Sequence, residues 1–207
     1  MLRVLILLLV PGLACAQELP PGASKNLPTL AKVYRTHWAP APLKHVAAGQ
    51  VEKESNWNER AHLHTDREDG YGLVQMTRTR SFNIYLSAVK WKALKGWDWR
   101  ADPYNPEKQL TFLVLQDKCN YEASKAVSPE ERWKIALVRY NAGDGRIAAR
   151  RRYALGAGLP TDRWTGGLEQ AHGALENSVL YGRPLWKAVN EYPRVVFKLA
   201  EKYRGKL

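Results

Sequence analysis

Glu54 is the residue of this chain whose position best suits acid catalysis. Ala47, Val51 and Glu54 are spaced by four and three residues, so they share one face of a helix. Trp57 follows closely, and a carboxyl group at the end of such an apolar stripe is expected to be partly desolvated. Desolvation raises the pKa of a carboxyl group and keeps its proton available near neutral pH. The spacing therefore predicts a general acid at Glu54, with a solvated glutamate at a helix end as the alternative.

A glycine-rich segment contributes the second group of candidates. Gly70 and Gly72 are expected to let the backbone approach a ligand closely, because glycine has no Cβ. Gln75 follows them and offers a hydrogen-bond donor and acceptors to a polar ligand. A simple glycine turn before a helix is the alternative interpretation.

Tyr140 and Asn141 lie at the end of another expected helix. Tyr140 continues the apolar stripe of Trp133 and Leu137, so its ring could belong to the core. We expect its hydroxyl to reach a cleft and to bond the Glu54 carboxyl group. Asn141 is either a substrate contact or a C-terminal helix cap.

Three segments, met in order along the chain, resemble the signature motifs of the lytic transglycosylase and goose-type lysozyme superfamily: Glu54-Ser55-Asn56-Trp57, Gly70-Tyr71-Gly72-Leu73-Val74-Gln75-Met76 and Arg139-Tyr140-Asn141-Ala142-Gly143. The resemblance covers residues 43–145 and implies that Glu54 is the catalytic acid. It also implies a set of substrate-binding residues: Ser55, Tyr71, Gln75, Tyr140 and Asn141.

Residues 65–75, which overlap the second segment, also resemble a goose-type pattern, Gly-Asp-Arg-Gly-x-Gly-Phe-Gly-Leu-Met-Gln. That resemblance implies that Asp66 is catalytic and positions water, but the family's further aspartate falls on Thr77. An inverting hydrolase needs a second carboxylate, roughly 6.5 to 9.5 Å from the acid. A lytic transglycosylase needs only Glu54, because the C6 hydroxyl of the muramic acid attacks C1. Glu68 and Asp69, in the same loop, are expected to be solvated charges.

Thr77 therefore favours an exported lytic transglycosylase that cleaves the MurNAc–GlcNAc β-1,4 bond and forms 1,6-anhydro-MurNAc. The close alternative is a goose-type lysozyme, a muramidase that hydrolyses the same bond. A non-catalytic cell-wall-binding protein is a third hypothesis, from another class. The resemblance implies peptidoglycan glycan strands as the partner, no nucleic acid, no cofactor and a monomer.

The elements that must position these residues are expected to be helices within a mainly α, single lysozyme-like domain over residues 30–207. Helical periodicity is expected over residues 43–55, from Asn105-Pro106 onward, from Ser128-Pro129 onward and from Pro193 onward. No run of alternating apolar and polar residues predicts a strand. Residues 17–29 contain prolines, a glycine and no apolar period, so they are expected to be a flexible leader.

The first sixteen residues have the pattern of a cleavable signal peptide. Arg3 precedes a short apolar stretch, and Ala14 and Ala16 fit the exporting peptidase. The apolar stretch is too short to span a bilayer, which takes about 20 residues. A periplasmic or secreted protein without stable membrane insertion is therefore expected. Lipidation of Cys15 is the alternative.

The net charge of +12 predicts that the protein binds a polyanionic partner. Eight tryptophans and ten tyrosines suit a glycan cleft, and Trp97 and Trp99 are expected to form an exposed platform. His62 and His64 have a spacing that can chelate, but no Cys or further His completes a ligand set, so no metal is predicted. Cys119 is expected to be a small core residue.

Overall fold

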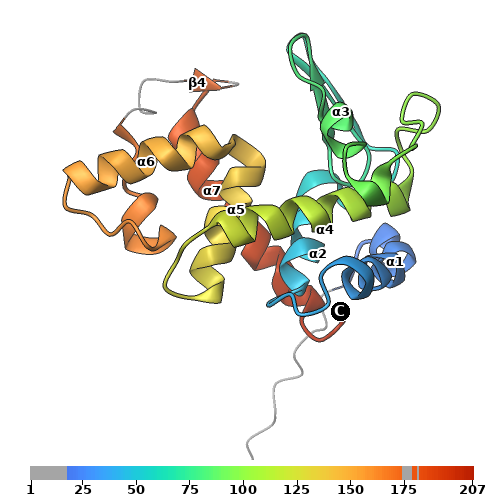
Figure 1. The fold of residues 1–207 in the computed structure, drawn as a ribbon, viewed down its shortest axis with the longest axis horizontal. Helices are drawn as coiled ribbons and strands as arrows, with labels where there is room; N and C mark the ends of the chain where they lie inside the picture. The colour runs from blue at the N-terminus through green and yellow to red at the C-terminus, as the bar shows by residue number, and fades with distance from the viewer. Residues whose placement is uncertain (1–17, 174–178, 181) are drawn as a thin grey trace, which may run out of the picture.

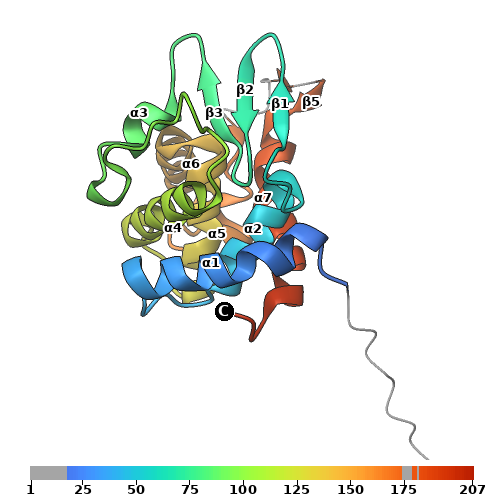
Figure 2. The same cartoon turned by 90° about the vertical axis from the view of Figure 1, so that its right-hand side faces the viewer.

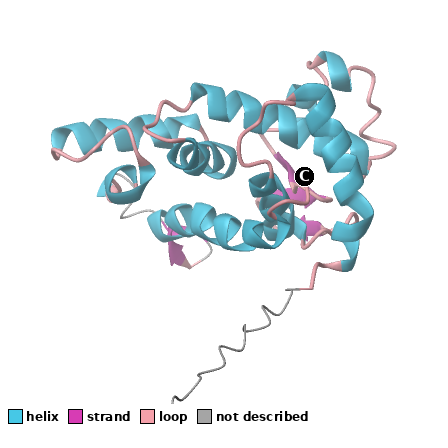
Figure 3. Ribbon diagram, turned by 90° about the horizontal axis from the view of Figure 1, so that it is seen from below, coloured by secondary structure: helices cyan, strands magenta, loops and turns pink. Residues whose placement is uncertain are grey.

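The computed structural model describes residues 18–173, 179–180 and 182–207 (Figure 1), and the predicted signal peptide lies outside this part of the chain. Helices dominate the described residues, which form a single domain (Figure 3). The longer helices are α1 (Pro21–His37), α2 (His45–Ser55), α4 (Pro106–Ala123), α5 (Pro129–Ala142), α6 (Asp144–Gly156) and α7 (Leu185–Ala200). Shorter helical pieces are α3 (Ile84–Ala88), η1 (Lys92–Leu94), η2 (Trp164–Leu168) and η4 (Glu201–Tyr203). Within the described ranges, no helix is long and apolar enough to cross a membrane.

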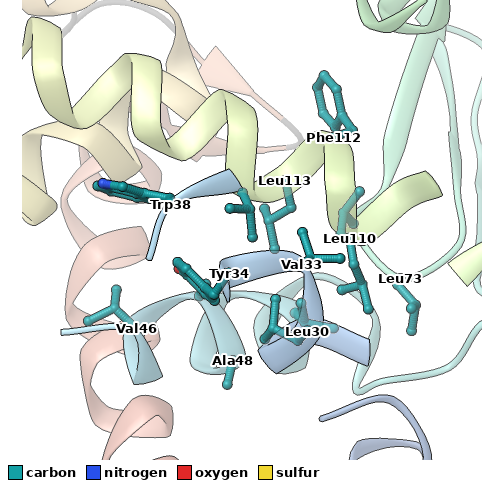
Figure 4. Close-up of a cluster of buried hydrophobic side chains, with 14 of the residues drawn as sticks. Leu30, Val33, Tyr34, Trp38, Val46, Ala48, Leu73, Leu110, Phe112 and Leu113 are labelled. Carbon is teal, nitrogen blue, oxygen red and sulfur yellow. The ribbon is translucent and has the colours of Figure 1, made fainter. Parts of the chain in front are cut away.

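Helix α1 corrects the predicted leader, because it begins at Pro21 and not near Leu30. Proline is compatible with the first turn of a helix, since its missing N–H has no intrahelical partner there. Burial then stabilises the helix: Leu30 and Val33 pack into the core beside Leu110 and Leu113 of α4 (Figure 4). The boundary at residue 30 is therefore wrong, because tertiary packing outweighs the local signal of the prolines and the glycine.

The starts of α4 and α5 agree with the capping residues in the sequence. The Asn105 side chain accepts a hydrogen bond from the Lys108 N–H at 3.0 Å, and Ser128 accepts one from the Glu131 N–H at 3.2 Å. The Glu131 carboxylate does not return to the helix start; it accepts the backbone N–H groups of Trp164 and Thr165 at 2.6 and 2.8 Å. Local capping thus begins α5, while its acidic residue ties the helix to η2.

The last helix differs from the prediction that it begins at Pro193. Helix α7 begins at Leu185 and continues through Pro193. Leu185, Val189, Tyr192 and Val196 are all buried and recur every three or four residues across the proline. Burial of this stripe against α2 and α5 offsets the cost of one interior proline.

A three-stranded antiparallel sheet is present although no strand was predicted. Strand β1 (His62–His64) pairs with β2 (Glu68–Tyr71), which pairs with β3 (Met76–Thr79). Figure 2 shows the three strands side by side above α2. Each has only three or four residues, and all of β1 is exposed, so no apolar alternation marks them. A short second sheet joins β4 (Val179–Leu180) to β5 (Arg183–Pro184).

Two further expectations about the core are wrong. Trp97 and Trp99 are buried rather than an exposed platform: Trp99 stacks on Tyr85 at 4.9 Å, and the Trp97 indole N–H donates to the Asp102 carbonyl at 3.0 Å. Cys119 is exposed on α4 and not part of the core. The Trp97 and Trp99 rings therefore pack in the core of the protein.

Candidate active site

A groove of about 1090 Å³ lies between α2, the three-stranded sheet, the end of α5 and the first half of α7. Glu54 opens onto it from the last turn of α2. Both basic and acidic residues line the groove. The lysine and arginine residues among them are Lys53, Arg67, Arg146 and Arg183. The site is therefore assembled from segments far apart in the sequence, which lie around one hollow.

Glu54 has the surroundings of a proton donor. Its side chain is half-buried at the groove, and burial raises the pKa of its carboxyl group above the ordinary value. A hydrogen bond from the Tyr192 hydroxyl and the charge of Lys53 both lower that pKa, but burial has the larger effect. The proton is consequently retained to higher pH than on a solvated glutamate, as a general acid requires.

Tyr192 is a site residue that the sequence analysis did not identify. It comes from α7, its hydroxyl donates to Glu54 Oε1, and burial together with the charge of Glu54 raises the pKa of the phenol well above its usual range. Tyr192 therefore stays protonated and available as a donor. The buried stripe of α7 contained a signal for a core tyrosine, but nothing in the sequence pairs it with Glu54.

Tyr140 lines the groove, yet its predicted bond to Glu54 is wrong. Its hydroxyl donates instead to the Val74 carbonyl at 2.8 Å, while Tyr192 is the tyrosine that bonds Glu54. Tyr140 still lies close enough for the charge of Glu54 to add to burial in raising the pKa of its phenol. Its role in the described structure is to hold the backbone of the glycine-rich segment against α5.

The glycine-rich segment packs on glutamine side chains. Gly70 lies so close to the Gln75 amide that a Cβ there would collide with it, and a Cβ at Gly72 would collide with Gln109. Gly72 and Gln75 both have positive φ, +69° and +48°. The Gln75 amide donates to the Gly72 carbonyl at 3.1 Å. These glycines therefore allow close packing within the protein, and Gln75, which lines the groove, is held by its own loop.

Ser55 and Asn141 both line the groove. The Ser55 hydroxyl lies 2.9 Å from the Leu73 carbonyl and 3.2 Å from the Val51 carbonyl, so it joins the end of α2 to the loop that carries Gln75. Asn141 is exposed at the last turn of α5, where its amide is accessible from the groove. The structure thus brings Ser55, Gln75, Tyr140 and Asn141 together around Glu54.

Asp66 and Tyr71 are not among the residues that line this groove. Asp66 is exposed and lines a separate cavity of about 500 Å³ with Thr65, Arg67 and Val179. Tyr71 stacks on His62 at 4.6 Å and packs against the core. The predicted placement of Asp66 and Tyr71 in the same groove as Glu54 is therefore wrong.

Thr77 lines the groove at the position where a second carboxylate was considered. Its hydroxyl donates to the Gln75 carbonyl at 3.0 Å. Among the described residues, the acidic side chains lining the groove besides Glu54 are Glu52, Glu68 and Glu191. Glu52 is paired with Lys202, and Glu191 is paired with Arg183 at 2.7 Å. Glu68 comes from β2 and is half-buried.

A further acid, Asp117, lies wholly buried in α4. Burial raises the pKa of its carboxyl group well above the usual range, and the charge of Glu54 adds to this effect. Asp117 is therefore a neutral acid near the groove and a poor candidate for a base that activates water.

No protein-family model matches the chain, and no curated protein matches it.

Proposed function

We propose that this protein is an exported peptidoglycan lytic transglycosylase with a lysozyme-like fold. The observation that carries the proposal is Glu54: a half-buried carboxyl group with a raised pKa, hydrogen-bonded by a neutral tyrosine hydroxyl and open to a groove. The groove has a volume of about 1090 Å³ and is lined by residues from β3 to α7, and we propose that it holds a glycan strand. Its partners are proposed to be peptidoglycan strands, which the protein meets as a monomer in the periplasm or outside the cell.

The proposed reaction uses one carboxyl group twice. Glu54 donates its proton to the glycosidic oxygen as the bond from that oxygen to C1 of MurNAc breaks. The resulting carboxylate then takes the proton of the MurNAc C6 hydroxyl as that oxygen bonds to C1. The products are a 1,6-anhydro end and a free GlcNAc hydroxyl, so Glu54 returns to its starting state. The intramolecular nucleophile is favoured by proximity, since effective molarities reach roughly 10⁵ M or more.

Hydrolysis is the second candidate, and the presence of Glu68 in the groove favours it. A second carboxylate opposite Glu54 is what an inverting glycosidase uses to activate water. Asp66, which the goose-type resemblance assigned to this task, lines the other cavity. If water is the nucleophile, Glu68 is therefore the better placed base.

Product analysis distinguishes the two candidates. Purified sacculi are digested with the wild-type protein, Glu54→Gln and Glu68→Gln, and the muropeptides are analysed by mass spectrometry. Transglycosylation gives 1,6-anhydro products, lighter by one water than lysozyme products, and an active Glu68→Gln. Reducing-end products with an inactive Glu68→Gln would establish hydrolysis. Sedimentation with sacculi without any product would instead indicate a binding protein.

A further inference from the structure

The β1–β2 hairpin gathers three potential metal ligands on one face. His62 and His64 are two residues apart on β1, so their side chains point to the same side of the sheet. Asp69 lies directly opposite His64 in the antiparallel register. The three side chains therefore converge although they come from different strands.

The donor atoms are close enough to share one ion. The His64 Nδ1 atom lies 2.6 Å from Asp69 Oδ1, and the His62 Nε2 atom lies 3.4 Å from the same oxygen. One ligand atom from each of the three residues lies within 4.8 Å of the others. Tetrahedral zinc sites have metal–ligand bonds of about 2.0 to 2.2 Å for nitrogen and oxygen, so their ligand atoms are about 3.4 Å apart. His62 and His64 are exposed, so rotation of their rings can adjust these separations.

We propose that His62, His64 and Asp69 form a binding site for a divalent transition-metal ion of the zinc class. Two imidazole nitrogens and one carboxylate oxygen select zinc, copper, nickel or cobalt over magnesium and calcium, which prefer all-oxygen sites. Three protein ligands leave a fourth coordination position facing solvent. The sequence offers no Cys or further His as a third ligand, whereas the strand pairing brings an aspartate, Asp69, opposite His64.

Neighbouring groups orient two of the ligands. The Tyr71 ring stacks on the His62 ring at 4.6 Å, with 18° between the ring planes, which fixes the orientation of the imidazole. The Arg78 guanidinium lies 3.9 Å from Asp69 Oδ2 and leaves Oδ1 directed at the histidines. Such outer contacts typically change metal affinity by 10–100-fold. The positive charge of Arg78 also opposes a cation, so the site is expected to be of moderate affinity.

Metal binding would join β1 to β2 at the wall of the groove. His62 itself lines the groove, next to Leu63. An ion held across the two strands would therefore limit the movement of this wall. The inference rests on the hairpin geometry and is independent of the reaction proposed for Glu54.

Calorimetric titration tests the site directly. The tag-free protein, freed of metal with a chelator, is titrated with ZnCl₂ at pH 7.5, and with MgCl₂ as a negative probe. We expect one zinc ion per chain and no magnesium binding. His64→Ala and Asp69→Asn should each weaken zinc binding by at least about tenfold, because each removes a ligand. His37→Ala, which changes a histidine of α1 outside the hairpin, is the matched control and should bind zinc normally.

Cobalt absorption supplies an independent readout. Co²⁺ in a low-coordinate site gives visible bands that should be absent in His64→Ala, and circular dichroism confirms that each variant is folded. Zinc binding that is undetectable, or equal in the wild type, His64→Ala and Asp69→Asn, would overturn the proposal.

Discussion

Glu52 and Glu54 lie in the same turn of α2, but their side chains have different surroundings. The Glu52 carboxylate is almost fully buried, with 7% of its side chain exposed, and it contacts the Lys202 ammonium and the Tyr203 hydroxyl near the C-terminus. Tyr203 in turn accepts the indole N–H of Trp57 at 2.8 Å. Glu54 faces the groove, and its hydrogen bond comes from the hydroxyl of Tyr192.

The difference shows that the group paired with a glutamate determines its properties: an ammonium group contacts Glu52, whereas a hydroxyl contacts Glu54. A cation compensates the charge of a buried carboxylate, so Glu52 joins α2 to η4 as half of an ion pair. A hydroxyl compensates that charge less, so burial raises the pKa of Glu54 and leaves it with a proton to donate. One region of the helix thus serves stability, and the other suits chemistry.

Glu54→Gln is expected to have the largest effect on activity. The amide is nearly isosteric but cannot protonate the leaving oxygen, so turnover of purified sacculi should fall by about 10² to 10⁴-fold. The melting temperature should stay at or above that of the wild type, because a half-buried ionisable group is removed. Glu122→Gln, an exposed position on α4, is the control and should leave both properties unchanged. A Glu54→Gln protein that clears cell walls at the wild-type rate would refute the assignment.

Glu52→Gln is expected to reverse that pattern. Removing one partner of a buried ion pair leaves Lys202 uncompensated and should lower the free energy of unfolding by about 3–5 kcal/mol. Activity per folded molecule should stay close to that of the wild type at temperatures well below the melting transition. Chemical denaturation measures the first quantity and sacculus turnover the second. Glu201→Gln, which breaks an exposed pair with Arg204, is the control and should have little effect on unfolding. Full stability of Glu52→Gln would contradict the comparison.

Tyr192→Phe should change the pH dependence of the reaction. The Tyr192 hydrogen bond lowers the pKa of Glu54, so its removal raises that pKa further. Loss of the acid's proton defines the alkaline limb of the profile of kcat/KM, and this limb should therefore move to higher pH. Activity at the optimum should fall by about 10- to 100-fold, since a hydrogen bond to a charged group contributes about 1.5–3 kcal/mol.

Tyr140→Phe provides the matched control for that shift. Its hydroxyl bonds the Val74 carbonyl, so its loss should reduce stability by about 1 kcal/mol and leave the alkaline limb in place. Equal shifts of the limb in both variants would show that the two tyrosines are not distinguished as described.

Asp66→Asn is expected to have the smallest effect, because Asp66 is exposed and lines the other cavity. Turnover should stay within about twofold of the wild type, in line with the small effects of most exposed substitutions. The products should still be 1,6-anhydro-muropeptides. An inactive Asp66→Asn would mean that Asp66 reaches the substrate and would favour the goose-type hydrolase.

The sequence by itself determined the features that depend on neighbours along the chain. The caps at Asn105 and Ser128 mark the starts of α4 and α5, because each side chain bonds an N–H three residues later. The spacing of Ala47, Val51 and Glu54 placed the three residues on one side of α2, since helical periodicity alone directs them there.

Only the tertiary structure decided which groups surround the two glutamates. Tyr192 is 138 positions from Glu54, and Lys202 is 150 positions from Glu52. The packing of α7 and η4 against α2 makes both contacts, and no local pattern encodes that packing. The same reason applies to α1, where burial against α4 overrides prolines that suggested a leader, and to the hairpin that joins Asp69 to two histidines. Propensity acts over a few residues, whereas these contacts are selected by the burial of side chains from the whole chain.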